Sequence, residues 1–167
     1  MPEFVMNLER IGGPRRRPAT GDLFVFRVHG EFLFGRVVGA NLPLSEAPMP
    51  GAHLLYIYAV RSDSPSAPST LDPHDLLIPP VFTNSMPWTK GYFRSIGTAP
   101  LEPSDLLPRL CFWDALLRRY RDQTGRAAES VGAQCGSWGL VSYRGLDDQI
   151  SHALGIPRAP LQPGDIE

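Results

Sequence analysis

Side chains that could perform catalysis or bind a metal are few in this sequence, and they lie far apart. The four histidines have no cysteine or carboxylate at the spacing of a zinc site: His29, His53, His74 and His152. The glycine-rich patterns that hold phosphates, GxxxxGKS, GxxxxGKT and GxGxxG after a strand, are also missing. We therefore predict no metal site and no cofactor.

The segment QCGSW, residues 134–138, comes closest to a catalytic motif. In cysteine proteases with a similar signature the nucleophile lies between the serine and the aromatic residue, and here nothing stands at that place. Cys135 is better explained as a small buried side chain. Asp147 and Asp148 do not form a pair of acids, because neighbours on a helix point in different directions and an N-cap explains the first. We predict that the protein is not an enzyme.

Length and composition favour one loop-rich domain. The chain has 167 residues with 18 prolines and 16 glycines, and 43% of its residues are hydrophobic. So many turn-forming residues argue for a mainly β protein rather than a helical bundle. We expect a flexible lead-in at residues 1–20, a single β-rich domain at 21–157 and a tail at 158–167.

Charge and cysteine content bear on partners and location. The net charge is -1, so no overall field recruits nucleic acid or an anionic membrane. Cys111 and Cys135 are too few to staple a domain of this size, and no signal peptide precedes the fold. No apolar run approaches the ~20 residues that span a bilayer. We expect a cytoplasmic protein with reduced thiols and no membrane partner.

Two arginine clusters are the places where contacts to phosphate could form. They are Arg15, Arg16 and Arg17 near the start, and Arg118, Arg119, Arg121 and Arg126 farther along the chain. These clusters motivate an alternative function, that of a nucleic-acid-binding small β-barrel protein. The near-neutral total charge disfavours nucleic acid as the partner.

The fold is organised around residues 21–38, GDLFVFRVHGEFLFGRVV, whose composition predicts a β-hairpin. A two-residue turn at Gly30 and Glu31 would place these residues opposite one another on one face: Phe24, Phe26 and Val28 across from Val37, Gly35 and Leu33. The other face would carry Val25 and Arg27 across from Arg36 and Phe34. Since neither face is polar, we predict a strongly bent antiparallel sheet or a small barrel. Gly35 would allow the bend while an aromatic ring covers its backbone.

Further strands are expected along the chain. Residues 53–61, HLLYIYAVR, predict a third strand with Leu55 and Ile57 on one side and Leu54, Tyr56 and Tyr58 on the other. Short apolar pieces follow at residues 76–78 and 92–96, and a short strand is predicted at 135–143. The fold class is mainly β (α+β).

Two helices are candidates in the second half. Residues 103–125 carry apolar side chains at steps of three and four: Leu106, Leu110, Trp113, Leu117 and Tyr120. A competing interpretation makes residues 110–113 a strand followed by a polar loop, so helix or strand plus loop stays open for residues 108–123. Residues 147–154 predict a C-terminal helix, with Asp147 as N-cap, Ile150 and Leu154 on one side and Gly155 as C-cap.

The segment 84–94, NSMPWTKGYFR, has the composition of a protein-binding surface. Tryptophan, tyrosine, methionine and arginine are enriched at interfaces, and here they occupy an irregular connection between strands. The residues expected to bind a partner are Met86, Trp88, Lys90, Tyr92 and Arg94. Alternatively, Trp88, Tyr92 and Phe93 plug the end of the sheet.

With these residues in view, the chain resembles the immunity protein 26 family of bacterial polymorphic-toxin systems. The resemblance rests on Gly21 and Asp22 opening a strand, on Phe34, Gly35 and Arg36 in its hairpin partner, and on the strand at residues 55–58. It extends over residues 20–142. It implies a cytosolic, mostly β protein that binds a cognate toxin or effector domain and blocks it, in competition between bacteria. The shared residues are structural and not catalytic, so the function is expected on the loops.

Overall fold

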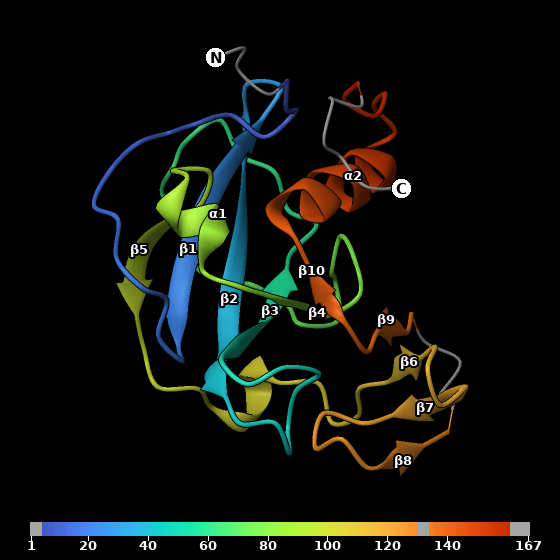
Figure 1. The fold of residues 1–167 in the computed structure, drawn as a ribbon. Helices are drawn as coiled ribbons and strands as arrows, with labels where there is room; N and C mark the ends of the chain where they lie inside the picture. The colour runs from blue at the N-terminus through green and yellow to red at the C-terminus, as the bar shows by residue number, and fades with distance from the viewer. Residues whose placement is uncertain (1–4, 130–133, 161–167) are drawn as a thin grey trace.

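The computed structural model describes residues 5–129 and 134–160, which form two sheets and two helices (Figure 1). The larger sheet has the strand order β10-β4-β3-β2-β1-β5. Its strands are β1 (Asp22–Val28), β2 (Glu31–Leu42), β3 (Ala52–Ile57), β4 (Val81–Thr83), β5 (Arg94–Thr98) and β10 (Leu140–Val141). This sheet curls strongly without closing, which confirms the mainly β class and the bent sheet rather than the closed barrel.

A smaller sheet lies beside the larger one. Its order is β8-β7-β6-β9, and its strands are β6 (Phe112–Asp114), β7 (Arg119–Arg121), β8 (Ala127–Ala128) and β9 (Gly136–Ser137). The helices are α1 (Met86–Thr89) and α2 (Tyr143–Leu154), and a single 3₁₀ turn spans Pro103–Asp105. None of the helices in the described residues is long and apolar enough to cross a membrane.

The β1–β2 hairpin confirms the predicted faces and corrects the predicted turn. The two turn residues are His29 and Gly30, with φ of 49° and 81°, the left-handed pair that twists with the strands. Phe24 therefore lies opposite Gly35 and not opposite Val37, its partner in the predicted register. Because the register moves by two positions, each residue stays on its expected face. A Cβ at Gly35 would collide with the Phe24 ring, so the ring takes the place of a side chain there.

Both faces of the curled sheet are covered, as expected from their lack of polar residues. Phe24 and Phe26 belong to one core together with Leu55 and Ile57 of β3. Val25 and Phe34 belong to a second core with Tyr56 of the same strand. The alternation predicted for residues 54–58 is thus confirmed, although β3 ends at Ile57 and Tyr58 only forms a bridge with Leu76.

The helix predicted at residues 103–125 is wrong. Residues 112–121 form the β6–β7 hairpin instead, so the competing strand interpretation is the better one. The spacing of three and four arose by chance, because Leu110 is buried in the second core whereas Trp113 and Leu117 are exposed. Pro108 also opposes a helix there, since a proline inside a helix removes a hydrogen bond.

Helix α2 starts four residues before its predicted N-cap. Ser142 caps it through an Oγ that accepts the Gly145 N–H at 3.0 Å, and Gly155 ends it with φ of 71°, as predicted. Asp147, predicted as the N-cap, is buried inside the helix, where its Oδ1 accepts the Leu8 N–H at 2.7 Å. Burial raises the pKa of the Asp147 carboxyl.

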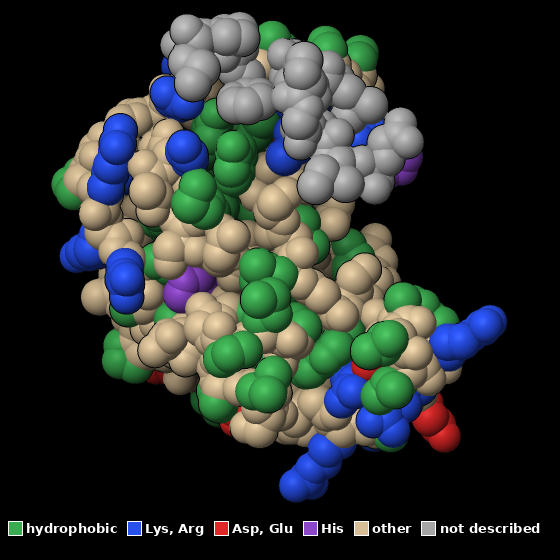
Figure 2. All heavy atoms as spheres, in the orientation of Figure 1, with side chains coloured by type: hydrophobic (Ala, Val, Ile, Leu, Met, Phe, Trp, Pro, Cys, Tyr) green, Lys and Arg blue, Asp and Glu red, His purple; other side chains and the backbone are tan. Residues whose placement is uncertain are grey.

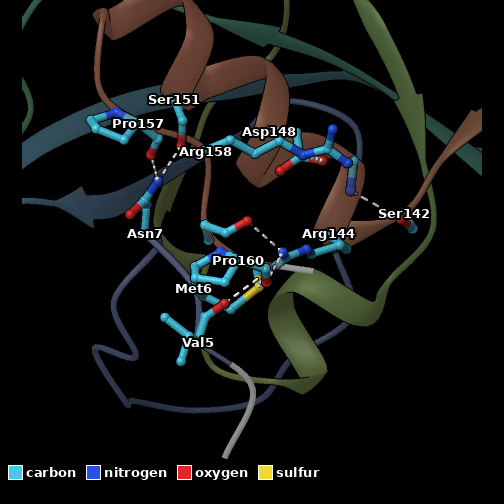
Figure 3. Close-up of polar contacts among 12 residues, drawn as sticks. Val5, Met6, Asn7, Ser142, Arg144, Asp148, Ser151, Pro157, Arg158 and Pro160 are labelled. Atoms are coloured by element: carbon cyan, nitrogen blue, oxygen red, sulfur yellow. Dashed lines mark hydrogen bonds and ion pairs between the residues drawn. The ribbon is translucent and has the colours of Figure 1, made fainter. Parts of the chain in front are cut away.

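Residues 5–11 pack onto the domain that was predicted to begin at residue 21. Figure 3 shows Asn7 reaching Ser151 and Pro157, with Nδ2 at 2.8 Å from the Ser151 Oγ and the Pro157 carbonyl oxygen. Arg144 of α2 donates to the Val5 and Pro160 carbonyl oxygens at 2.7 Å and 2.6 Å. The two ends of the described chain therefore meet on α2. Residues 1–4 of the predicted lead-in and 161–167 of the predicted tail lie outside the described residues.

The prediction of reduced thiols is corrected by the structure. Cys111 and Cys135 form a disulfide that joins the chain before β6 to the chain before β9, 24 residues apart. Two cysteines are too few to staple a domain of this size as a whole. They are enough for the smaller sheet, which has only short strands and little core of its own.

Candidate functional site

The predicted partner segment folds mostly inward. Trp88 and Tyr92 each expose only 3% of their surface. The Trp88 ring packs edge-on against Phe24 and Phe93, with centroids 5.2 Å away in both cases, and Tyr92 stacks on Tyr143 of α2 at 5.8 Å. These aromatic residues close one end of the first core. Contact of Trp88 or Tyr92 with a partner stays a prediction, and in this conformation little of either side chain is available for it.

The rest of the segment retains accessible surface. Lys90 is exposed, and Met86 and Arg94 are half-buried. The N-terminal chain runs alongside, since the Ile11 N–H donates to the Gly91 carbonyl oxygen at 3.0 Å and Gly13 contacts the Arg94 side chain. Of the predicted residues, the structure thus leaves these three on the surface.

This surface is positively charged. Residues 10–20 and 84–98 together carry no acidic residue and six basic ones, Arg10, Arg15, Arg16, Arg17, Lys90 and Arg94. Lysine and arginine side chains line the left side of Figure 2, over the N-terminal chain, α1 and β5. We call these six residues the basic face.

His53, the histidine nearest this face, has a structural role. Its Nδ1 accepts the Asn41 N–H at 3.0 Å, so its Nε2 carries the proton and donates to the Ser85 Oγ at 2.8 Å. Burial lowers the pKa of His53, and the charge of Arg17 lowers it further. A neutral imidazole thus fixes the start of α1 to β3.

The five motif residues make contacts that hold the sheet together. Gly21 has φ of 92°, and a Cβ there would collide with the Ala99 carbonyl oxygen. Asp22 accepts the Ala19 N–H at 2.9 Å, and Arg36 donates to the Gly21 and Ala99 carbonyl oxygens, each at 3.1 Å. Phe34 lies in the second core, and Gly35 lies against the Phe24 ring of the first. These contacts fit the structural role predicted for the motif.

A second accessible surface lies at the tip of the β6–β7 hairpin, residues 114–121, which we call the leucine hairpin. Leu116 is 90% exposed and Leu117 is 51% exposed. Large apolar side chains are unusual at a hairpin tip, where turn-forming polar residues predominate. The next residue, Arg118, has φ of 52°, a conformation that residues other than glycine seldom adopt.

Asp114 fixes the shape of this tip. Its Oδ1 accepts the N–H groups of Leu116 and Leu117 at 3.0 Å and 3.1 Å, and its Oδ2 accepts from the Arg121 Nε at 2.7 Å. Arg121 also donates to the Gly125 carbonyl oxygen at 2.8 Å and lies over the Trp138 ring. The hydrogen bond from Arg121 holds the pKa of the Asp114 carboxyl below its usual value, with smaller contributions from the two backbone donors.

The leucine hairpin borders an open groove of about 630 Å³. Its opposite wall is the loop at residues 43–51, where Leu44 is 65% and Met49 is 51% exposed. Figure 2 shows hydrophobic side chains from the lower centre to the lower right, over this loop and the smaller sheet, with lysine or arginine side chains and fewer acidic ones around them. Arg118 and Arg119 are exposed and enter no ion pair among the described residues.

This surface was not predicted, because the apolar spacing of residues 103–125 placed Leu117 on the buried side of a helix. The useful signal was Asp114, since an aspartate commonly accepts backbone N–H groups two and three residues ahead in a turn. Among the described residues, no group of three or more histidine, cysteine or acidic side chains could hold a metal ion.

The comparisons with known proteins identify a family. A family model described as Immunity protein 26 matches residues 19–122, which include the leucine hairpin and every strand of the curled sheet except β10. No curated protein and no solved structure matches the chain. With most of its length matched by that model, the chain belongs to the Immunity protein 26 family.

Proposed function

We propose that this protein binds a cognate toxin or effector domain and neutralises it, protecting the producing cell and its kin. The observation that carries the proposal is the family match over residues 19–122. The surface supports it, because a rigid two-sided sheet presents exposed loops that combine leucine, methionine and arginine side chains.

Neutralisation requires only binding in this proposal. A bound immunity protein covers the toxin's active site or a surface beside it, and complementary shape and charge determine which toxin is accepted. Inhibition should therefore be stoichiometric. Titrating purified protein into a toxin assay should abolish toxin activity near one equivalent, whereas an enzyme that inactivates the toxin would act at a small fraction of an equivalent.

The proposal is tested by expressing the chain together with the toxin encoded by the neighbouring gene. We expect growth to be rescued and the two proteins to co-purify as a complex. A variant with Leu55→Asp, which places a charge in the first core, controls for the need for a folded protein. If the wild-type chain neither rescues growth nor forms a complex, the proposal is wrong.

The alternative function, binding of nucleic acid by a small β protein, is favoured by the basic face. Six basic residues without an acidic one in residues 10–20 and 84–98 could contact phosphates. Fluorescence anisotropy with labelled single- and double-stranded oligonucleotides tests it. Affinity that falls steeply between 50 mM and 200 mM salt, roughly a thousandfold for six phosphate contacts, would support the alternative, and no binding at low salt would remove it.

The proposed function also requires a compartment in which the protein meets its toxin. The sequence predicts the cytoplasm, but disulfides such as the one joining Cys111 to Cys135 persist mainly in oxidising compartments. Trapping free thiols with an alkylating reagent in intact cells, followed by mass spectrometry, shows which state exists there. Unmodified, linked cysteines would argue for an oxidising location, and two alkylated cysteines for the cytoplasm.

A further inference from the structure

The leucine hairpin carries more exposed apolar surface than the fold requires. Leu116 is 90% exposed and contributes almost nothing to either core, and Leu117, Leu44 and Met49 extend the apolar surface across the groove. Single exposed leucines are common on protein surfaces, but a contiguous apolar patch with a polar rim marks an interaction site.

The hairpin is also held in one shape before any partner arrives. The Asp114 carboxylate binds both leucine N–H groups and Arg121, and Arg121 is itself fixed by the Gly125 carbonyl oxygen and the Trp138 ring. The disulfide at Cys111 anchors the strand that leads into the hairpin. Such preorganisation lowers the entropy lost on binding, so the two leucines can act as rigid anchors.

Charge around the tip indicates the chemistry of the partner. Arg118 and Arg119 directly follow the leucines, are exposed, and form no ion pair within the part of the chain that the structure describes. The nearest acidic side chain on the hairpin, Asp114, is buried and already engaged by Arg121. A partner that fits this surface would place an apolar pocket over the leucines and carboxylates opposite the arginines.

The arginines and leucines together argue against two other binding partners, a second copy of this chain and nucleic acid. A symmetric dimer through this surface would bring Arg118 and Arg119 of both copies into one interface, with only Glu46 of each 43–51 loop as an exposed acid to offset them, so like charges would repel. Nucleic acid would satisfy the arginines but would leave the leucines against a charged backbone. The combination of leucines and arginines therefore fits a protein with an acidic rim around an apolar pocket.

We propose that the leucine hairpin, together with the wall formed by Leu44 and Met49, is the surface that docks the toxin, which contributes an apolar pocket edged by carboxylates. This inference rests on the function proposed above. Leu116 and Leu117 are the main anchors in this inference. Arg118 and Arg119 steer association through their charge, and the buried Trp88 makes no contact with the toxin.

The test measures the affinity of purified protein for the purified toxin domain of the neighbouring gene by calorimetry. The double variant Leu116→Ala and Leu117→Ala should lose about 30-fold or more in affinity, the loss typical of anchor residues at an interface. Its urea unfolding midpoint should match that of the wild type, since the leucines are exposed. Leu106→Ala is the matched control, because Leu106 is an exposed leucine of a different loop, 37% accessible, and should change affinity less than threefold.

A second pair of variants removes the charge of the hairpin tip while keeping its shape. Arg118→Asn keeps a residue that tolerates positive φ, and Arg119→Gln keeps side-chain length, so the hairpin should retain its structure. Their combination should slow association and weaken its dependence on salt, while dissociation changes little.

The outcomes distinguish this inference from the function on which it rests. If the wild-type chain binds and inhibits the toxin and the leucine variant does so within threefold, the docking surface lies elsewhere and only this inference is overturned. If the wild type does not bind the toxin, both fall. Sedimentation that shows a wild-type dimer and a monomeric leucine variant would overturn the inference in favour of self-association.

Discussion

The segment around α1 and the leucine hairpin contain similar residue types, yet the fold uses them in opposite ways. In the first, Trp88 and Tyr92 turn inward because Phe24, Phe93 and Tyr143 line a space that large rings can fill. In the second, the short strands of the smaller sheet offer no such space at the tip, so Leu116 and Leu117 remain outside. Residue composition alone therefore does not distinguish an exposed apolar surface from a core.

The largest contrast is expected in stability. Trp88→Ala should lower the free energy of unfolding by about 3–5 kcal/mol, because it empties a large buried site between aromatic rings. Leu116→Ala, at a 90% exposed site, should change it by less than about 0.5 kcal/mol. Urea unfolding followed by circular dichroism measures both. Equal effects would mean that the two regions do not differ as described.

Removing the disulfide should weaken the hairpin region while leaving the α1 region intact. The bond between Cys111 and Cys135 closes a loop of 24 residues, so the double change to serine should cost about 3 kcal/mol. The wild type in excess dithiothreitol should behave as the variant does, and the variant should not respond to the reductant. Hydrogen exchange should rise first in residues 112–121, and faster exchange in residues 84–94 instead would contradict the assignment.

Acidification should loosen the hairpin before it affects α1. The pKa of Asp114 is lowered in the folded protein, so its contribution to stability is complete above its unfolded pKa of about 3.8 and is lost as the pH falls through the lower folded value. Protection of the Leu116 and Leu117 N–H groups against exchange, relative to the intrinsic rate at each pH, should therefore decrease below pH 4. Asp114→Asn should remove this dependence. Asp147 supplies an opposite control, because its raised pKa makes its contribution more favourable as the pH falls toward 3.8.

The smallest effects are expected on the basic face. Lys90→Ala and Arg94→Ala should leave the unfolding free energy within about 0.5 kcal/mol of wild type, since neither enters an ion pair among the described residues. If the hairpin docks the toxin, affinity should change less than threefold in calorimetry. A loss larger than that of the Leu116 and Leu117 variant would move the docking surface back to the segment favoured by the sequence.

The hairpin at residues 21–38 and the C-terminal helix were predictable because local rules govern them. Alternating apolar residues identified both faces of β1 and β2, and Gly155 marked the end of α2. The turn was misplaced by one residue because His29 adopts the positive φ that glycine more often supplies. The prediction of Asp147 as the N-cap was wrong. Its carboxylate accepts the distant Leu8 N–H, and the sequence alone does not distinguish such a buried aspartate from an N-cap.

The candidate docking surface depended on long-range contacts and could not be predicted in the same way. The helical spacing of Leu110, Trp113 and Leu117 was accidental, and only the pairing of Phe112 with Arg121 and Gly136 reveals a sheet. The Cys111–Cys135 bond likewise depends on two segments meeting in space. Burial of Trp88 depends on the register that places Phe24 opposite Gly35.

The contact between Leu8 and Asp147 has a consequence for the order of folding. It joins residues 139 positions apart, whereas the β1–β2 hairpin closes over two residues. Closing so long a loop costs more entropy, so the hairpin should form early and the N-terminal chain should dock on α2 late. Changes that remove this contact should therefore speed unfolding and leave the folding rate nearly unchanged, a difference that stopped-flow kinetics of Asp147→Ala would show.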